Sequence, residues 1–258
     1  MASPSAKSLS GNALTGRSSG HVVALPGSGC LLHPEAIRAF LALQSAARGA
    51  GLELQAVSGF RDLARQLAIW NGKFRGERPV LDRQGQPLDM AALDEPGRVD
   101  AILVWSALPG ASRHHWGSDF DVLDAATVPA GEPPRLEARD FAPMGRHAAL
   151  ADWLPRHAAD YGFFRPYDSD RGGVHPEPWH LSFAPVAVPA QAAMSAALVA
   201  EALAGVDIEG RTTIGQRLPA LFERYVTAVA SPPPEALAAR LAQGPAQGDA
   251  LSRASRPA

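Results

Sequence analysis

The chain has 258 residues, 46% of them hydrophobic and 19% charged, and this is the composition of a globular protein with one large domain or two small ones. The formal net charge is −2 at pH 7, and no run of like charges is present. We therefore expect neither nucleic acid nor an anionic membrane surface as a partner.

The first 20 residues are rich in Ser, Gly and Ala without periodicity, and we predict a flexible N-terminal segment there. They contain no apolar run long enough for a signal peptide, and no later segment has the length of a membrane span. We expect a cytoplasmic protein, or a periplasmic one if a leader precedes the sequence. The single cysteine, Cys30, cannot form an intramolecular disulfide, which agrees with a reducing compartment.

Residues 21–188 are predicted to form one domain of mixed helix and strand. Its first half contains two amphipathic helices, over 33–51 and 61–74, on either side of a segment at 52–60 that alternates like a strand. A long insertion follows at 75–110, and in it we predict a small hairpin and then a helix.

The second half of this domain is predicted to contain two strands, at 119–124 and 179–186, with a helix at 147–162 between them. The rest of the chain is almost wholly helical. We predict a C-terminal helical appendage over 189–243 and a flexible tail over 244–258. The fold class that follows is α+β.

One short segment, SRHHWGSDFD at 112–121, contains more polar side chains than a solvated loop requires. His114 and Asp121 are seven residues apart, which suits a turn followed by a strand better than one helical face. Gly117 lies between them and allows the backbone to bend. Such a pair can hold a metal ion from two sides.

A second polar motif, HPEPWH at 175–180, places Glu177 three residues before His180. Hydrolytic zinc sites typically use three protein ligands from His, Asp and Glu and leave the fourth position to a water molecule, whose pKa falls to ~7. His114, Asp121 and His180 satisfy that count. Glu177 would then accept the proton of the water and pass it to the leaving amine.

The order and separation of these motifs resemble those of zinc D-Ala-D-Ala peptidases of the VanY type, which are LAS metallopeptidases. SRHHWGSDFD resembles Ser-x-His-x-x-Gly-x-Ala-x-Asp, EPWH resembles Glu-x-x-His, and SGFRDLARQ at 58–66 resembles Ser-x-Tyr-Arg-x-x-x-x-Gln. The resemblance covers residues 20–188. It implies a LAS/hedgehog-like core, in which a small antiparallel sheet with flanking helices carries the metal in a groove, here with a C-terminal helical extension.

Carried over position by position, the resemblance implies three ligands for Zn²⁺ and one catalytic base, namely His114, Asp121 and His180 for the metal and Glu177 for the base. It also implies that Arg61 meets the substrate carbonyl or carboxylate, that Gln66 helps to orient the peptide, and that Ser112 binds the terminal carboxylate. The forked guanidinium of an arginine suits recognition of a carboxylate or of a developing oxyanion.

The chain departs from the family pattern at Asp119, where alanine is usual. Asp119 and Asp121 lie on the same face of the predicted strand, so Asp119 either orients a ligand histidine, which we favour, or competes for the metal. Among the other histidines, His175 is the best rival ligand. His115 is expected on the pocket wall or the surface.

The resemblance implies peptidoglycan stem peptides or muropeptides as substrates. A cytoplasmic enzyme that cut D-Ala-D-Ala would destroy the wall precursors of its own cell, whereas removal of the last D-Ala from a recycled tetrapeptide would be harmless. We therefore expect an L,D-carboxypeptidase. The alternatives are a D,D-carboxypeptidase, a D,D-dipeptidase or endopeptidase with the same zinc site, and a non-catalytic zinc-containing peptidoglycan-binding module. The presence of Glu177 with all three ligands argues against the last.

Overall fold

The structure, a computed structural model, describes residues 8–242, and the predicted tail at 244–258 lies outside them. Its main sheet has four antiparallel strands in the order β3-β4-β6-β5, which confirms the predicted α+β class with a small antiparallel sheet. A separate hairpin pairs β1 with β2. The strands are short, and they comprise β1 (Val23–Ala24), β2 (Leu31–Leu32), β3 (Leu54–Ser58), β4 (Asp119–Asp124), β5 (Phe163–Phe164) and β6 (His180–Phe183).

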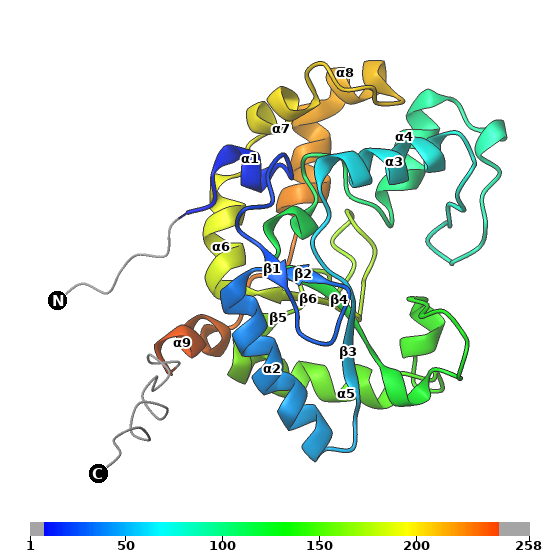
Figure 1. The fold of residues 1–258 in the computed structure, drawn as a ribbon. Helices are drawn as coiled ribbons and strands as arrows, with labels where there is room; N and C mark the ends of the chain where they lie inside the picture. The colour runs from blue at the N-terminus through cyan, green and yellow to red at the C-terminus, as the bar shows by residue number, and fades with distance from the viewer. Residues whose placement is uncertain (1–7, 243–258) are drawn as a thin grey trace, which may run out of the picture.

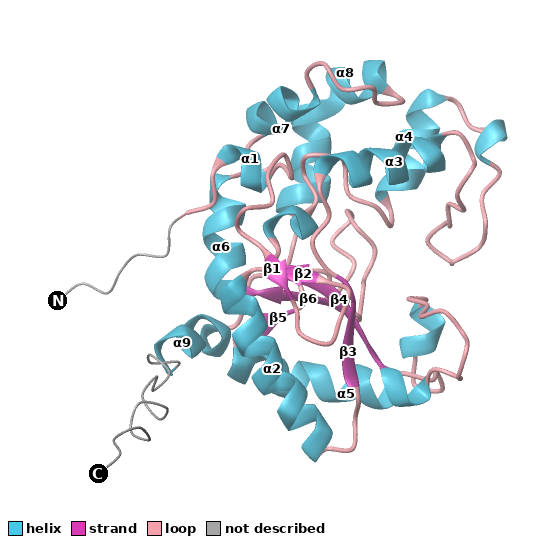
Figure 2. Cartoon of the chain, viewed as in Figure 1, coloured by secondary structure: helices cyan, strands magenta, loops and turns pink. Residues whose placement is uncertain are grey.

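Two groups of helices flank the sheet (Figure 1; Figure 2). On one side lie α2 (Pro34–Gly49) and α5 (Ala148–His157). On the other side lie α3 (Leu63–Phe74) and α4 (Glu95–Leu103), covered in turn by helices from the C-terminal part of the chain. Each group encloses a hydrophobic core, so the sheet separates two cores.

Helix α2 shows why the first predicted helix forms. Pro34 stands in its first turn, and the His33 side chain accepts a hydrogen bond from the backbone N–H of Glu35. Ile37, Phe40 and Leu43 recur at helical spacing and are buried against the sheet. Burial of each such side chain stabilises the fold by about 1.5–3 kcal/mol.

The alternation of β4 gives the sheet one apolar face and one polar face. Phe120 and Val122 belong to the core beneath α2 and α5. Asp119 and Asp121 therefore point to the opposite face, as their spacing predicts. In the pairing of β4 with β6, Asp121 stands opposite His180. The register thus brings two residues together that are far apart in the sequence.

The insertion between α3 and β4 has the two predicted parts. Leu81 and Pro87 pair across a tight turn, in which the Asp82 carboxylate accepts from the backbone N–H groups of Gln84 and Gln86. A single 3-10 turn (Met90–Ala92) and then α4 follow. The helix ends at Leu103, five residues earlier than the predicted helix at 97–108, and the residues after it face the cavity described below.

A short helix lies within residues 8–20, where the sequence alone predicts a flexible segment. The helix α1 (Gly11–Leu14) begins at Ser10, whose side chain accepts from the backbone N–H of Ala13. Leu14 is buried in the core, and its carbonyl accepts a hydrogen bond from Trp116. The sequence does not reveal this helix, because its contacts are with residues far away in the chain. Four helical residues are also too few to show a periodicity. Residues 1–7 lie outside the described range.

The C-terminal helices begin earlier, and pack more closely, than an appendage starting at residue 189. Pro185 lies in the first turn of α6, and it ends the strand predicted over 179–186. The helices are α6 (Ala184–Ala193), α7 (Ala196–Leu203), α8 (Arg211–Phe222), a π turn (Glu223–Thr227) and α9 (Pro234–Ala242). They share one core with α3 and α4, so this part of the fold is continuous with the central domain.

Among the described residues, no single helix is long and apolar enough to cross a membrane. The pair α6 and α7, which is bent by 82°, reaches that length and composition only when both helices are counted together.

Candidate metal centre and its cavity

His114, Asp121 and His180 come together at the polar face of the sheet. His114 lies in a 3-10 turn (Arg113–Trp116) that ends at Gly117, where φ is +68°. A Cβ atom at this position would clash with Cγ1 of Val22 and lie 2.9 Å from the backbone nitrogen of His33, so glycine is required both for the conformation and for the space. The predicted bend between His114 and Asp121 is confirmed.

The three side chains form a compact and buried cluster, with one ligand atom from each within 4.8 Å of the others. Nε2 of His114 is 3.6 Å from Oδ2 of Asp121, and Nδ1 of His180 is 3.3 Å from Oδ1 of Asp121. The two imidazole rings meet edge to face, with centroids 5.0 Å apart. The atoms of different residues thus converge on one point.

The unpartnered atoms of this cluster fit a metal ion. Oδ1 of Asp121 and Nδ1 of His180 are both buried and lack a hydrogen-bond partner among the described residues. Nδ1 of His114 instead lies 3.0 Å from the carbonyl oxygen of Gly59, to which it donates when the ring is neutral, and this leaves Nε2 as a lone-pair donor. Two imidazole nitrogens and one carboxylate form a donor set that suits zinc.

The electrostatics of the cluster agree with that fit. Burial, together with the charge of Arg61, lowers the pKa of His114 to about 3, so this imidazole is neutral as a ligand must be. Burial opposes ionisation of Asp121, but the histidines and Arg61 outweigh it and lower the pKa of this carboxyl to about 2. Burial also opposes the charge on His180, yet its contacts with three carboxylates raise its pKa well above the ordinary value. The three carboxylates thus stabilise a positive charge at the His180 ring, and a metal ion bound at Nδ1 would supply one.

Asp119 occupies the other side of the His180 ring. Its Oδ1 is 3.2 Å from Nε2 of His180, whereas Asp121 and Glu177 face Nδ1. Asp119 is fully buried and also pairs with Arg113 at 2.7 Å. The geometry therefore supports the favoured interpretation, in which Asp119 orients His180 rather than competes for the metal.

The positive charge of Arg113 stabilises the buried carboxylate of Asp119 next to the cluster. Its guanidinium is buried, donates to Asp119 and to Ser182, and extends to the Gln191 side chain on α6. This cation outweighs the effect of burial on Asp119, whose pKa falls to about 2. A helix of the C-terminal part thus supports the strand that carries the ligands.

Glu177 lies directly beside the cluster. It precedes β6 in a turn, where the backbone N–H of His180 donates to its carbonyl, and its Oε2 is 3.2 Å from Nδ1 of His180. Its carboxylate is buried, and this raises its pKa in spite of the neighbouring His180. A carboxyl of this kind, next to a metal site and open to the cavity, is suited to accept and return a proton.

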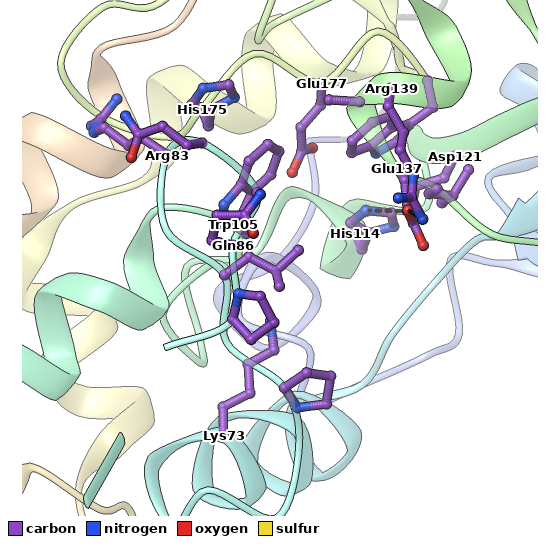
Figure 3. A pocket seen from close by; sticks show the side chains of 18 of the residues that line it. Lys73, Arg83, Gln86, Trp105, His114, Asp121, Glu137, Arg139, His175 and Glu177 are labelled. Carbon is purple, nitrogen blue, oxygen red and sulfur yellow. Dashed lines mark ion pairs between the residues drawn. The ribbon is translucent and has the colours of Figure 1, made fainter. Parts of the chain in front are cut away.

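Two adjoining cavities open onto the cluster. The larger has a volume of about 780 Å³ and lies between the hairpin of the insertion and the segment 136–139 (Figure 3). The smaller has a volume of about 40 Å³, and several of the residues that line it are buried, among them Ser106, Ser112, Arg113 and His180. Both are lined by Arg61, Trp105, His114 and Glu177, so the cluster stands where they meet.

The substrate residues expected from the sequence line the smaller cavity, with one exception. Arg61 lines both cavities, and its buried Nε has no partner among the described residues. Ser112 lines the smaller cavity, and its buried hydroxyl is likewise unpartnered. Gln66 instead lies behind the wall, fully buried, where it accepts from Nη1 of Arg61 at 3.1 Å and donates to the carbonyl of Ala107. Gln66 therefore holds the Arg61 side chain in place and does not itself line the space where a peptide would bind.

The two remaining histidines of the motifs lie outside the cluster. His175 lines the larger cavity, with its ring 4.3 Å from that of Trp105. The prediction for His115 is wrong, because it is fully buried and lies neither on the surface nor on the wall of either cavity. It binds the Arg61 carbonyl through Nδ1 and the Gly110 N–H through Nε2, which fixes the turn beneath the cluster.

Several residues of the cavity wall were not singled out from the sequence. Tyr167 packs edge-on against His180 at 5.0 Å, and Trp105, Ser106 and Lys73 come from the insertion and from α3. None belongs to a motif of recognisable spacing. Only the proximity of the PYDSDRGG loop to HPEPWH in the sequence could have indicated Tyr167.

The contact of Asp119 with His180 leads to a prediction. Asp119→Asn should weaken zinc binding by about 10- to 100-fold, because the His180 ring loses its charged anchor. Competition with a chromophoric chelator measures this affinity. Ser182→Ala is the matched control, since it removes one Arg113 contact and leaves the His180 anchor in place. Equal affinities for the Asp119→Asn variant and the parent would rule out this role.

Comparison with protein families identifies a match over most of the central domain. Residues 29–186, more than half of the chain, match the family model described as VanY: D-alanyl-D-alanine carboxypeptidase. Two uncharacterized proteins of Haemophilus influenzae (strain ATCC 51907 / DSM 11121 / KW20 / Rd) are also similar. One is 49% identical over 98 residues, which are 37% of this chain and 67% of that protein. The other is 29% identical over 121 residues, which are 46% of this chain and 92% of that protein.

The chain is also similar to solved structures of two peptidases. The structure of the LdcB LD-carboxypeptidase has a TM-score of 0.48 and 20% sequence identity, and the match covers 80% of this chain and 79% of that chain. A mutant of the vancomycin resistance D,D-pentapeptidase VanY in complex with Zn(II) has a TM-score of 0.45 and 21% identity, with 70% and 88% of the two chains covered.

Proposed function

Since the chain belongs to the VanY family of D-alanyl-D-alanine carboxypeptidases, we propose that it is a zinc-dependent carboxypeptidase that removes the C-terminal D-alanine from peptidoglycan stem peptides. The observation that carries this proposal is the convergence of His114, Asp121 and His180 on one point, with Glu177 beside them on the wall of a small cavity. A buried carboxylate in this place suits proton transfer and argues against a module that only binds.

The chain's own residues can perform the steps of a peptide hydrolysis. When bound, zinc would supply a Lewis acid that polarises the substrate carbonyl and acidifies a water molecule. Glu177 accepts the proton of the attacking water and returns it to the nitrogen of the leaving D-alanine. Arg61 faces the same space with an unpartnered nitrogen and stabilises negative charge on an oxygen of the substrate. Ser112 binds the terminal carboxylate in the smaller cavity.

The residue before the scissile bond distinguishes two forms of this activity. Our expectation from the sequence is the L,D form, which converts a tetrapeptide into a tripeptide, whereas the description of the matched family favours the D,D form. Mass spectrometry of products from purified tetrapeptide and pentapeptide separates them. Loss of one alanine from the tetrapeptide indicates the L,D form, and loss of one alanine from the pentapeptide alone indicates the D,D form. Release of no alanine from either peptide would refute the proposed function.

Arg61 provides a prediction on the substrate side. Arg61→Lys should lower kcat/KM by about 10- to 100-fold, because an ammonium cannot reproduce the forked contact of a guanidinium with a substrate oxygen. Zinc content and melting temperature should stay close to those of the parent. Arg65→Lys is the matched control, because Arg65 follows four residues later, in the first turn of α3, and is exposed. A lysine variant of Arg61 that melts much lower but keeps its catalytic efficiency would show that Arg61 has a structural role instead.

A further inference from the structure

Lys73 is a cation on the cavity wall without an acidic partner. It is partly buried on α3, extends to the larger cavity (Figure 3), and donates a hydrogen bond of 2.6 Å to the hydroxyl of Ser106. Among the described residues, no carboxylate lies within 4.0 Å of its ammonium. Two other cations of that wall are neutralised, Arg83 by Asp170 and Arg139 by Glu137. Lys73 is one of only two lysines in the sequence.

The hydrogen bond between Lys73 and Ser106 has a fixed direction. A lysine ammonium carries three donors and no acceptor, so the Ser106 oxygen accepts. The proton of the Ser106 hydroxyl is then free to be donated elsewhere. Ser106 is buried and lines the smaller cavity, whereas Lys73 lines the larger one. Through this hydrogen bond, the positive charge of Lys73 acts on a hydroxyl that lines the smaller cavity.

The smaller cavity collects donors that lack acceptors. The Ser112 hydroxyl and Nε of Arg61 are buried there without partners among the described residues, and the Ser106 hydroxyl adds a third donor. Glu177 is the single acidic residue among those that line it. Three donors from residues that line one small cavity, two of them associated with cations, are suited to hold an anion.

The size of this cavity limits which anion fits. Its volume of about 40 Å³ exceeds the ~10–15 Å³ that one water molecule requires, but leaves room for only a few non-hydrogen atoms. This space suits one small residue with a free carboxylate at its end better than a longer stretch of peptide beyond the cleaved bond. The body of a substrate has space only in the larger cavity, of about 780 Å³.

We infer that Lys73 polarises the Ser106 hydroxyl so that it donates to the terminal carboxylate of the substrate, which makes this pair a determinant of carboxypeptidase rather than endopeptidase specificity. This inference rests on the proposed function, and it adds to it a positioning residue, Lys73, that acts through Ser106. A hydrogen bond whose donor is polarised by an adjacent cation is stronger toward a carboxylate than toward a neutral amide.

The charge state of Lys73 is consistent with this role. Burial lowers its pKa to about 8, while the nearby charge of Glu177 acts in the opposite direction. The ammonium is therefore still mostly protonated at pH 7, and the Ser106 oxygen remains the acceptor.

The test compares peptides that end in D-alanine with a free carboxylate and with an amide. For the parent protein, kcat/KM should be higher for the free acid. Lys73→Met keeps the length of the side chain without its charge, and it should reduce the ratio of the acid to the amide by about tenfold or more, mainly through a higher KM for the acid. Ser106→Ala should do the same. The double variant should reduce the ratio of the acid to the amide no further than either single variant, because Lys73 acts through Ser106. Lys73→Arg, which keeps the charge, should retain more of the preference than Lys73→Met.

A binding measurement keeps this inference separate from the proposed function. Calorimetry with the zinc-loaded Glu177→Gln protein measures the affinity for both peptides without turnover, with and without Lys73→Met. The inference predicts that the lysine strengthens binding of the free acid only. An unchanged ratio of acid to amide in the Lys73→Met variant, by kinetics or by binding, would overturn the inference and leave the carboxypeptidase activity standing. Loss of zinc or of folding in both Lys73→Met and Ser106→Ala would also overturn it, because the pair would then be structural.

Discussion

Glu177→Gln should lower kcat by about 100- to 10,000-fold while the protein stays folded and keeps its zinc, since this is the range that a positioned general base contributes. Glutamine has nearly the shape of glutamate but cannot accept the proton of the attacking water. Glu177 is 3.2 Å from His180 without being needed for the three-atom cluster, so its substitution leaves the ligand set intact. Steady-state release of D-alanine and metal analysis of the same sample measure both effects.

A measurement of substrate binding by the same variant shows whether the loss of activity is a loss of catalysis alone. The Glu177→Gln protein should still bind a stem peptide, because Arg61 and Ser112 remain on the cavity wall. Turnover within a few-fold of the parent would show that another group accepts the proton. The assignment of Glu177 would then have to be withdrawn.

Substitution of a zinc ligand should lower activity by as much, but through loss of the metal rather than loss of the base. His114→Ala and His180→Ala should each contain almost no zinc and show no measurable turnover. Removal of a direct ligand costs more than the ~10- to 100-fold in affinity that loss of a hydrogen-bonded neighbour costs. A metal that binds only the folded state adds about 4 kcal/mol to the free energy of unfolding at a thousandfold excess over its Kd. Chelation should therefore lower the melting temperature of the parent and leave that of the His114→Ala protein unchanged.

His175→Ala is the matched control for these variants. His175 lies in the same motif as His180 and on the wall of the larger cavity, but outside the three-residue cluster. The His175→Ala protein should contain one zinc per chain. A loss of zinc in this variant, with retention in His180→Ala, would mean that the wrong histidine of the motif had been assigned.

The sequence was sufficient to predict the parts of the site that depend on local geometry. The alternation of DFDVLD predicts that Asp119 and Asp121 share a face, and Gly117 predicts the bend before them, since both follow from the backbone alone. The strand at His180 was also predicted, although its pairing with β4 was not. The family resemblance supplied the link between the two motifs that periodicity could not.

The remaining features depend on contacts between residues far apart in the sequence. Arg113 and Asp119 form a buried pair that also reaches α6, and neither residue alone indicates it. The sequence predicts the helices after β6 from their apolar periodicity, but it does not show which surface they cover. In the structure they cover α3 and α4 and share a core with them, so they are more than an appendage. The position of Lys73 beside Ser106 likewise depends on how the insertion folds back on α3.

One zinc ion in each chain should be held by Nε2 of His114, the Asp121 carboxylate and Nδ1 of His180. Anomalous diffraction from zinc-loaded crystals, recorded above and below the zinc absorption edge, locates the metal directly. We expect one strong peak per chain within ~2.0–2.2 Å of each of these three ligands. A peak bound to Nε2 of His180 or to Asp119, a peak at His175, or no peak at the cluster would contradict it.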